Sequence, residues 1–345
     1  MKKILFCLVL GFVVSGLSKK CFAIIDKPGW RYSPFFGSSI NYLSLDELKP
    51  YKYSSGQVGM LYTLKGGYID LGHLKESADR TRYLYDIVYE SLLADKKEFS
   101  YNIVDSAEYS VNLTYPLGWN SLSRDEKQKI AHEVSADLAP YLAFISTVWH
   151  EIITWYGYSS VGLFSEKPSS FSWEDLYSDL MGSNIASESL KSKKDFEAEV
   201  TSIMRKHLIE LDVQEKSVAK SATKTIRGKW FSGMCYPAIH MMKRSFDIGL
   251  DNGCITPWLV PGICKNPSPK SYCFIHHLEN ISQRGFSFKL TLFPKEMQSK
   301  KILKLVQKDE KINYLLPETD FLKIVESIKQ EAIKEQGVNV GEQDF

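Results

Sequence analysis

The chain of 345 residues lacks the features that mark nucleic-acid-binding and membrane-spanning proteins. Its 43 basic and 41 acidic residues nearly cancel, and they are dispersed, whereas nucleic-acid binders gather basic side chains on one face. Beyond the N-terminus, no apolar run reaches the roughly 20 residues of a membrane span. The sequence contains no evident repeat or low-complexity segment. We therefore expect a globular protein that does not bind nucleic acid and has no transmembrane span in its mature form.

The N-terminus has the layout of a secretory signal peptide. Lys2 and Lys3 precede an apolar run over residues 4–14, and small and polar residues follow up to Ala23. We expect cleavage after Ala23, so residues 1–23 form the signal peptide and the protein is periplasmic or secreted. Cleavage removes four lysines and no acid, which brings the formal net charge from +2 to about −2.

Cysteine is scarce. After cleavage only four cysteines remain, and all lie close together in the C-terminal third of the chain: Cys235, Cys254, Cys264 and Cys273. In an oxidising compartment such a set predicts two disulfides, with three alternative pairings. A zinc site is the rival interpretation, but no spacing is of the C-x2-C type. The disulfides would hold residues 253–271, which are rich in proline and glycine.

Helical patterns dominate the rest of the chain. An apolar stripe predicts a helix from about Leu71, and capping boxes at Ser123 and Ser172 predict two further starts. Pro140 is expected to begin or kink the buried helix at residues 138–155. Residues 192–211 and 321–334 have helical spacing, whereas residues 215–229 are expected to form an exposed connector.

Strand patterns are short and few. Residues 108–115 and 286–293 alternate apolar and polar side chains, which is typical of half-buried strands. The predicted fold is α+β, with a mainly helical core, short strands and a disulfide-stapled C-terminal region. We expect the helical core with N-terminal strands over residues 24–230 and the cysteine-containing region, packed on the same core, over residues 231–345.

The best candidate site is the doublet His150-Glu151. It lies within residues 138–165, which are otherwise uncharged and mostly apolar, and an ionised side chain in such surroundings requires polar, ionic or metal partners. The H-E-x-x-H motif of zinc hydrolases is broken, because Thr154 stands at the position of its second histidine. Any metal would need ligands from other segments. The alternative is a buried His–Glu pair that orients packing through hydrogen bonds.

Two further segments carry candidate ligands. Residues 66–73 end in Asp70 and His73 at a helix start, where Asp70 could also be an ordinary N-cap. Asp79 is expected to face solvent. Residues 171–180 carry three acids, of which Asp175 is explained by the capping box, while Glu174 and Asp179 flank the apolar stripe. We prefer Asp179 as the ligand. His276 and His277 are expected to lie on the surface of a loop.

Three stretches, GGYIDLGHLKESAD, WHEIITWYGYSS and FSEKPSSFSWEDLYSDLMG, resemble signature segments of a family of exported bacterial proteins, domain-of-unknown-function family 4056. The resemblance covers residues 66–182. It implies an envelope location and places the candidate residues in motif positions: Asp70, His73, His150, Glu151, Glu174, Asp175 and Asp179. It implies no activity.

These residues support a metal-dependent hydrolase as the leading hypothesis. Asp70, His73, His150 and Asp179 are the predicted metal ligands, zinc is the expected ion, and Glu151 is the predicted catalytic base. The substrate would be a cell-envelope component or a small molecule, and the oligomeric state is left open. The alternative is a non-catalytic envelope binding or structural protein in which the same residues form a closed hydrogen-bonded network.

Overall fold

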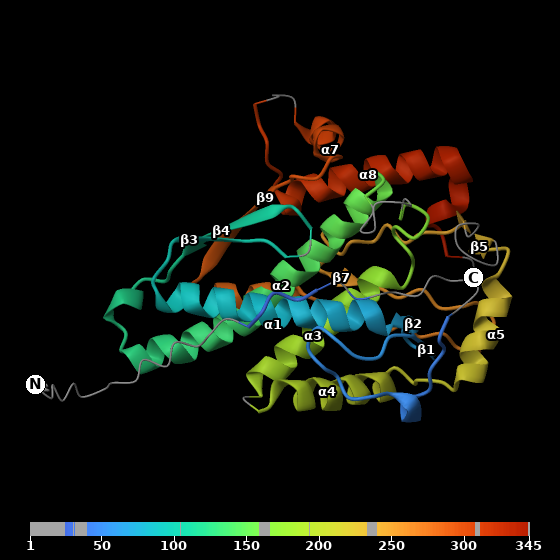
Figure 1. Ribbon diagram of the computed structural model, residues 1–345, viewed down its shortest axis with the longest axis horizontal. Coiled ribbons are helices and arrows are strands. Elements are labelled where there is room, and N and C mark those ends of the chain that lie inside the picture. Colours follow the sequence, from blue (N-terminus) through green and yellow to red (C-terminus); the bar gives the residue numbers. More distant parts are fainter. Residues whose placement is uncertain are drawn as a thin grey trace, which may run out of the picture.

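Three long helices form the centre of the fold: α1 (Leu71–Leu93), α2 (Arg124–Trp155) and α3 (Asp175–Lys191). In the computed structural model they pack pairwise against one another, and Figure 1 shows α8 and α4 on opposite sides of this group. The structure describes residues 25–29, 31, 40–103, 105–158, 166–192, 194–232, 240–307 and 311–343. The predicted signal peptide and Cys235 lie outside these ranges.

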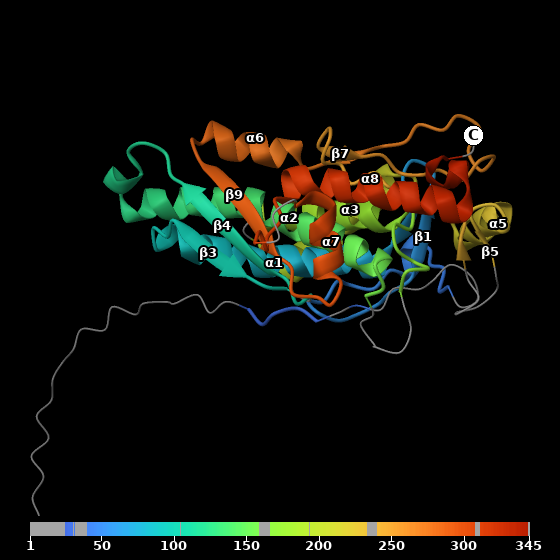
Figure 2. The same ribbon diagram turned by 90° about the horizontal axis from the view of Figure 1, so that it is seen from above.

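Shorter helices surround the centre. They are α4 (Phe196–Glu210), α5 (Lys216–Ile226), α6 (Ile275–Gln283), α7 (Ser299–Val306) and α8 (Pro317–Gln336), with 3-10 turns at Leu45–Glu47, Trp119–Ser121 and Val338–Gly341. Figure 2 shows α6 and α1 on opposite sides of α2, and α2 contacts both. Helix α2 is thus covered on both faces. Among the described helices, none combines the length and apolarity needed to cross a membrane.

The strands are short and antiparallel. The largest sheet has the order β3 (Glu98–Tyr101), β4 (Glu108–Thr114), β9 (Ser287–Phe293), and β4 pairs with β9 along its whole length, from Glu108 opposite Phe293 to Thr114 opposite Ser287. Both predicted strands are confirmed, and their pairing joins segments far apart in the sequence. The described residues also form three two-stranded ladders: β1 (Met60–Thr63) with β2 (Gly67–Asp70), β5 (Phe231–Ser232) with β6 (His240–Met241), and β7 (Cys254–Ile255) with β8 (Tyr272–Cys273). The predicted α+β class is confirmed.

Pro140 does not begin α2, so the expectation that the buried helix starts there is wrong. The helix runs from Arg124 to Trp155 with Pro140 inside it. A proline cannot donate to the carbonyl four residues earlier, which leaves the carbonyl of Ala136 without its helical partner. The hydroxyl of Ser187 on α3 donates to this carbonyl at 2.7 Å. A neighbouring helix therefore supplies the hydrogen bond that the proline removes.

Three other expectations are corrected. Residues 215–229 contain α5 rather than an exposed connector, because Ala219, Ala222 and Ile226 form a buried stripe between the lysines. Asp79 is buried rather than solvent-facing, because Arg31 donates to it at 2.6 Å and Tyr51 is a second hydrogen-bond partner. The second histidine of the His276-His277 pair is buried in α6.

The buried histidine, His277, has two polar partners. Its Nδ1 lies 2.9 Å from Asp137 in α2, and its Nε2 lies 3.0 Å from the amide oxygen of Asn184 in α3. An adjacent pair in a loop would place both rings at the surface, whereas a helix turns the second ring toward the core. His277 therefore helps to attach α6 to the central helices.

The C-terminal region is held by a disulfide between Cys254 and Cys273, which joins β7 to β8. Cys264 is a free thiol, and the second predicted disulfide would involve Cys235, which lies outside the described residues. Side chains of this region, including Phe274, Leu290 and Ile328, belong to the same buried apolar cluster as α1, α2 and α3.

Candidate metal centre

The β1–β2 hairpin positions the first candidate ligand. Asp70 is the last residue of β2 and the N-cap of α1, and its Oδ1 accepts hydrogen bonds from the amides of Gly72 at 2.6 Å and His73 at 3.4 Å. Its own amide donates to Ser178 of α3 at 2.9 Å. The capping role is confirmed, and the same contacts fix the Asp70 carboxylate beside α3.

His73 lies between two carboxylates of α3. Its Nε2 is 3.4 Å from Asp175 Oδ1, and its Nδ1 is 3.3 Å from Asp179 Oδ2. Asp175 and Asp179 are one helical turn apart, so both face α1. The possible ligand atoms of Asp70, His73 and Asp175 all lie within 4.8 Å of one another. These three residues could hold a metal ion.

The predicted capping role of Asp175 is wrong. Helix α3 begins at Asp175 itself, its N-cap is Glu174, and that cap makes no side-chain hydrogen bond to the helix. Ser172 instead donates its hydroxyl to the Glu174 carboxylate at 2.6 Å. With no cap to make, Asp175 directs its carboxylate to His73. The S-x-x-D spacing fits a capping box equally well, so the sequence alone does not distinguish a cap from a ligand at Asp175.

A glycine brings the two halves of the centre together. A Cβ atom built on Gly182 of α3 would lie 1.9 Å from the carbonyl oxygen of Leu74 in α1. Only a residue without a side chain permits this approach. The contact fixes the distance between the helix that carries His73 and the helix that carries both aspartates.

The centre holds more buried acid than buried base. Five carboxylates, those of Asp70, Glu151, Glu174, Asp175 and Asp179, belong to residues that are at most 5% exposed. Burial raises the pKa of Glu174 to about 8, with a further contribution from Asp70, and burial raises the pKa of Asp175 well above its usual range although His73 opposes this. Such an excess of desolvated negative charge favours either proton uptake or a bound cation.

The surroundings of the His73 imidazole favour its charged form. Burial favours its neutral form, but the charges of Asp175 and Asp179 outweigh burial and raise its pKa well above the usual value. Its side chain is 20% exposed, which makes it the most accessible member of the group. Asp179 on Nδ1 and Asp175 near Nε2 reproduce the arrangement in which a carboxylate orients a metal-binding imidazole.

Glu151 of α2 completes the surroundings of the centre. Burial raises its pKa, while both His150 and His73 lower it, so its carboxylate interacts electrostatically with both imidazoles. Glu151 accepts a hydrogen bond from the amide of Phe171, which has a φ of 56°. A left-handed backbone is costly for a phenylalanine and is typical of functional sites.

His150 has a separate carboxylate partner. Its Nδ1 lies 3.3 Å from Asp105 Oδ1, and its ring meets Tyr158 edge to face with centroids 5.8 Å apart. His150 lies outside the group formed by Asp70, His73 and Asp175. Buried Arg80 of α1 interacts electrostatically with both Asp105 and Asp179. Sequence reasoning missed Asp105 and Arg80, because neither stands in an apolar segment that would single it out.

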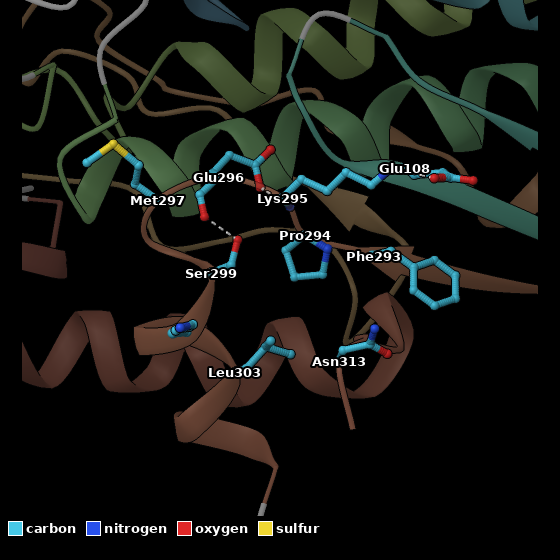
Figure 3. Close-up of a pocket in the computed structure, with 10 residues that line it drawn as sticks. Glu108, Phe293, Pro294, Lys295, Glu296, Met297, Ser299, Leu303 and Asn313 are labelled. Carbon is cyan, nitrogen blue, oxygen red and sulfur yellow. Dashed lines mark hydrogen bonds and ion pairs between the residues drawn. The ribbon is translucent and has the colours of Figure 1, made fainter. Parts of the chain in front are cut away.

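A surface pocket lies where β9 is followed by α7. It is lined by residues of β9, α7 and the turn between them, and Figure 3 shows Lys295, Glu296 and Ser299 along it. Glu296 accepts from the amide of Ala107 at 2.9 Å and from the indole of Trp149 at 3.4 Å. Burial raises the pKa of Glu296, and Asp105 adds to this effect. The inner wall of the pocket therefore interacts electrostatically with the partner of His150.

The fold and this centre define a mainly helical α+β protein with a buried group of carboxylates and an imidazole that could hold a metal ion. The chain belongs to the family described as Protein of unknown function (DUF4056), whose family model matches residues 37–256. The resemblance found in residues 66–182 is thereby confirmed. No curated protein and no solved structure matches the chain.

Proposed function

We propose that the protein is an exported metal-dependent hydrolase whose divalent ion is held by Asp70, His73 and Asp175. The single observation that carries the proposal is the convergence of these three ligand groups from β2, α1 and α3 within 4.8 Å of one another. A divalent cation offsets the excess of buried negative charge and removes the need for protonated carboxylates. The predicted ligand roles of His150 and Asp179 stay predictions.

The donor set fits a divalent ion of intermediate hardness. One imidazole and two carboxylates suit zinc, which we expect, and also manganese or iron. Asp179 would accept the Nδ1 proton of His73 and so keep the Nε2 lone pair directed at the ion. This assignment gives both aspartates of α3 a role and explains why they are four residues apart.

The chemistry that the ion would supply is Lewis-acid assistance to the attack of water on an ester, amide or phosphoester. Glu151 would accept the proton of the attacking water, because burial has brought its pKa closer to neutrality. The Phe171 amide would hold the Glu151 carboxylate in place during this transfer. The substrate would be a cell-envelope component or a small molecule, in keeping with the predicted export.

The competing function is a non-catalytic envelope protein with a closed polar network. Protein groups already hydrogen-bond several of the acids, as Ser172 does for Glu174 and Phe171 does for Glu151. In that case the protein would bind no metal with high affinity.

The test is hydrolysis of a panel of para-nitrophenyl acetate and para-nitrophenyl phosphate esters by the mature protein before and after metal removal. We expect chelation to abolish turnover and zinc or manganese to restore it. Glu151→Gln should retain the metal and lose about 100-fold or more in rate, the usual contribution of a general base. Full activity of the chelated protein would contradict the proposal.

A further inference from the structure

The exposed side of α7 is basic. Residues 295–306 contain four lysines and a single acid, Glu296, and that acid is buried. Three of the lysines lie on α7 and are exposed: Lys300, Lys301 and Lys304. The fourth, Lys295, pairs with Glu108 at 2.6 Å. Helix α7 therefore presents positive charge, in a chain whose formal net charge would be about −2 after signal-peptide cleavage.

The neighbouring helix shows what an ordinary solvated surface looks like in this protein. Helix α8 packs against α7 and carries both signs of charge on its exposed side, at Glu318, Lys323 and Glu326. Mixed charges of this kind are typical of a helix face that meets only water. Helix α7 contains no acid. Solvation alone therefore explains the surface of α8 better than that of α7.

Apolar side chains are exposed beside these lysines. Met297, in the turn before α7, is 96% exposed, and Leu305 on α7 is 38% exposed. Buried Ile302 attaches the helix to the core, and Figure 1 shows α7 at an edge of the molecule, on the outer side of α8. Single exposed apolar residues are common, but apolar residues among lysines on one short helix are typical of helices that lie in a membrane interface.

The pocket beside α7 adds a recess with apolar walls. Its volume is about 820 Å³, which is within the range of sites that bind small molecules. Figure 3 shows Phe293, Pro294 and Leu303 around it, and Lys295 and Lys300 also line it. Lysines beside an apolar recess match the chemistry of an anionic phospholipid, which joins a charged phosphate to apolar chains.

We propose that α7 and the turn before it, residues 294–306, form a docking surface for a bilayer that contains anionic phospholipids. The lysines of α7 would contact lipid phosphates, while Met297 and Leu305 would enter the interface. Charge complementarity is the argument for this partner, and the predicted export would bring the mature protein to such a membrane. The inference does not depend on the metal centre.

The experiment is co-sedimentation of the mature protein with vesicles of phosphatidylcholine mixed with phosphatidylglycerol, and with vesicles of phosphatidylcholine alone. We expect binding to the mixed vesicles that weakens as salt is added, and much weaker binding to the neutral ones. The double variant Lys300→Gln with Lys304→Gln should lower the partition coefficient by about 25-fold, because each lysine near an anionic surface contributes about 5-fold. Met297→Gln should lower it by about 10-fold through lost apolar burial.

The matched control is Lys220→Gln with Lys224→Gln on α5. These lysines are also exposed and four residues apart on one helix, so the net charge changes equally. The control should bind the mixed vesicles as tightly as the wild type. Equal losses in the two double variants would overturn the inference, because net charge alone would then explain the binding. Failure of the wild type to bind the mixed vesicles at low salt, or equal binding to the neutral ones, would also overturn it.

Discussion

Gly182 of α3 lies against Leu74 of α1 so closely that a Cβ atom would stand 1.9 Å from the Leu74 carbonyl oxygen. Leu74 follows His73 directly, and Gly182 is three residues after Asp179. The closest approach of the two helices therefore lies next to the contact between imidazole and carboxylate.

Gly182→Ala should push α1 and α3 apart. We expect a loss of about 1–3 kcal/mol in the free energy of unfolding, the usual cost of overpacking, together with weaker metal binding. Ser183→Ala is the matched control, because Ser183 is also buried but its hydroxyl bonds only within α3. Denaturant unfolding and metal titration of both variants check this. Unchanged metal affinity in Gly182→Ala would contradict the role of this contact.

The hydrogen bond from Ser187 to Ala136 predicts a specific coupling with Pro140. Ser187→Ala leaves the Ala136 carbonyl buried without a partner and should cost about 1–3 kcal/mol of unfolding free energy. Pro140→Ala restores an amide that can donate to that carbonyl. In the Pro140→Ala background the same serine substitution should therefore cost much less. A double-mutant cycle measured by urea unfolding checks this, and additive effects would refute the compensation.

Glu174 predicts how the stability of the metal-free protein depends on pH. Its pKa is raised from 4.5 in the unfolded chain to about 8 in the folded protein, so the folded state keeps a proton that the unfolded state releases. The stabilisation is fully present below about pH 4.5 and is lost as the pH rises toward 8. Unfolding curves of chelated wild type and Glu174→Gln should diverge over this range, with the wild type falling by a few kcal/mol. Added zinc should reduce the difference, and parallel pH profiles without metal would contradict the assignment.

The Cys254–Cys273 disulfide closes a loop of about 20 residues, for which the entropic contribution is about 3 kcal/mol. Cys254→Ser with Cys273→Ser should lower the thermal midpoint, and dithiothreitol should lower the wild-type midpoint to a similar value. Dithiothreitol should have little further effect on the double variant. An equally large drop in that variant would show that another disulfide carries the stability.

Much of the fold follows from local patterns in the sequence. Some patterns predict a single structure that the neighbouring residues also support. They are the apolar stripe in α1, the capping box at Ser123 and the alternation in β4 and β9. Predictions from the sequence are wrong where a residue far away in the chain determines the local structure. Pro140 continues a helix because Ser187 replaces its hydrogen bond, and Asp79 is buried because Arg31 reaches it.

In the candidate site too, local patterns identify some residues, whereas tertiary contacts determine the role of others. Asp70 and His73 could be singled out because they stand at the junction of a strand and a helix. The choice among the three acids of residues 174–179 depends on where α3 starts, and the sequence leaves that start uncertain by one turn. The capping box that the sequence predicts for Asp175 is one that α3 does not make. Their spacing predicts only that the acids share one helix. The contact with His73 in the folded protein identifies the acids that belong to the site.

The most direct test of the central claim is the metal content of the mature protein, purified without chelator and analysed by plasma mass spectrometry. We predict about one divalent ion per chain in the wild type and in His276→Ala, whose ring is exposed, and strongly reduced metal in His73→Ala and Asp175→Asn. Folded wild-type protein that contains no metal and takes up none on addition of zinc or manganese would contradict the account.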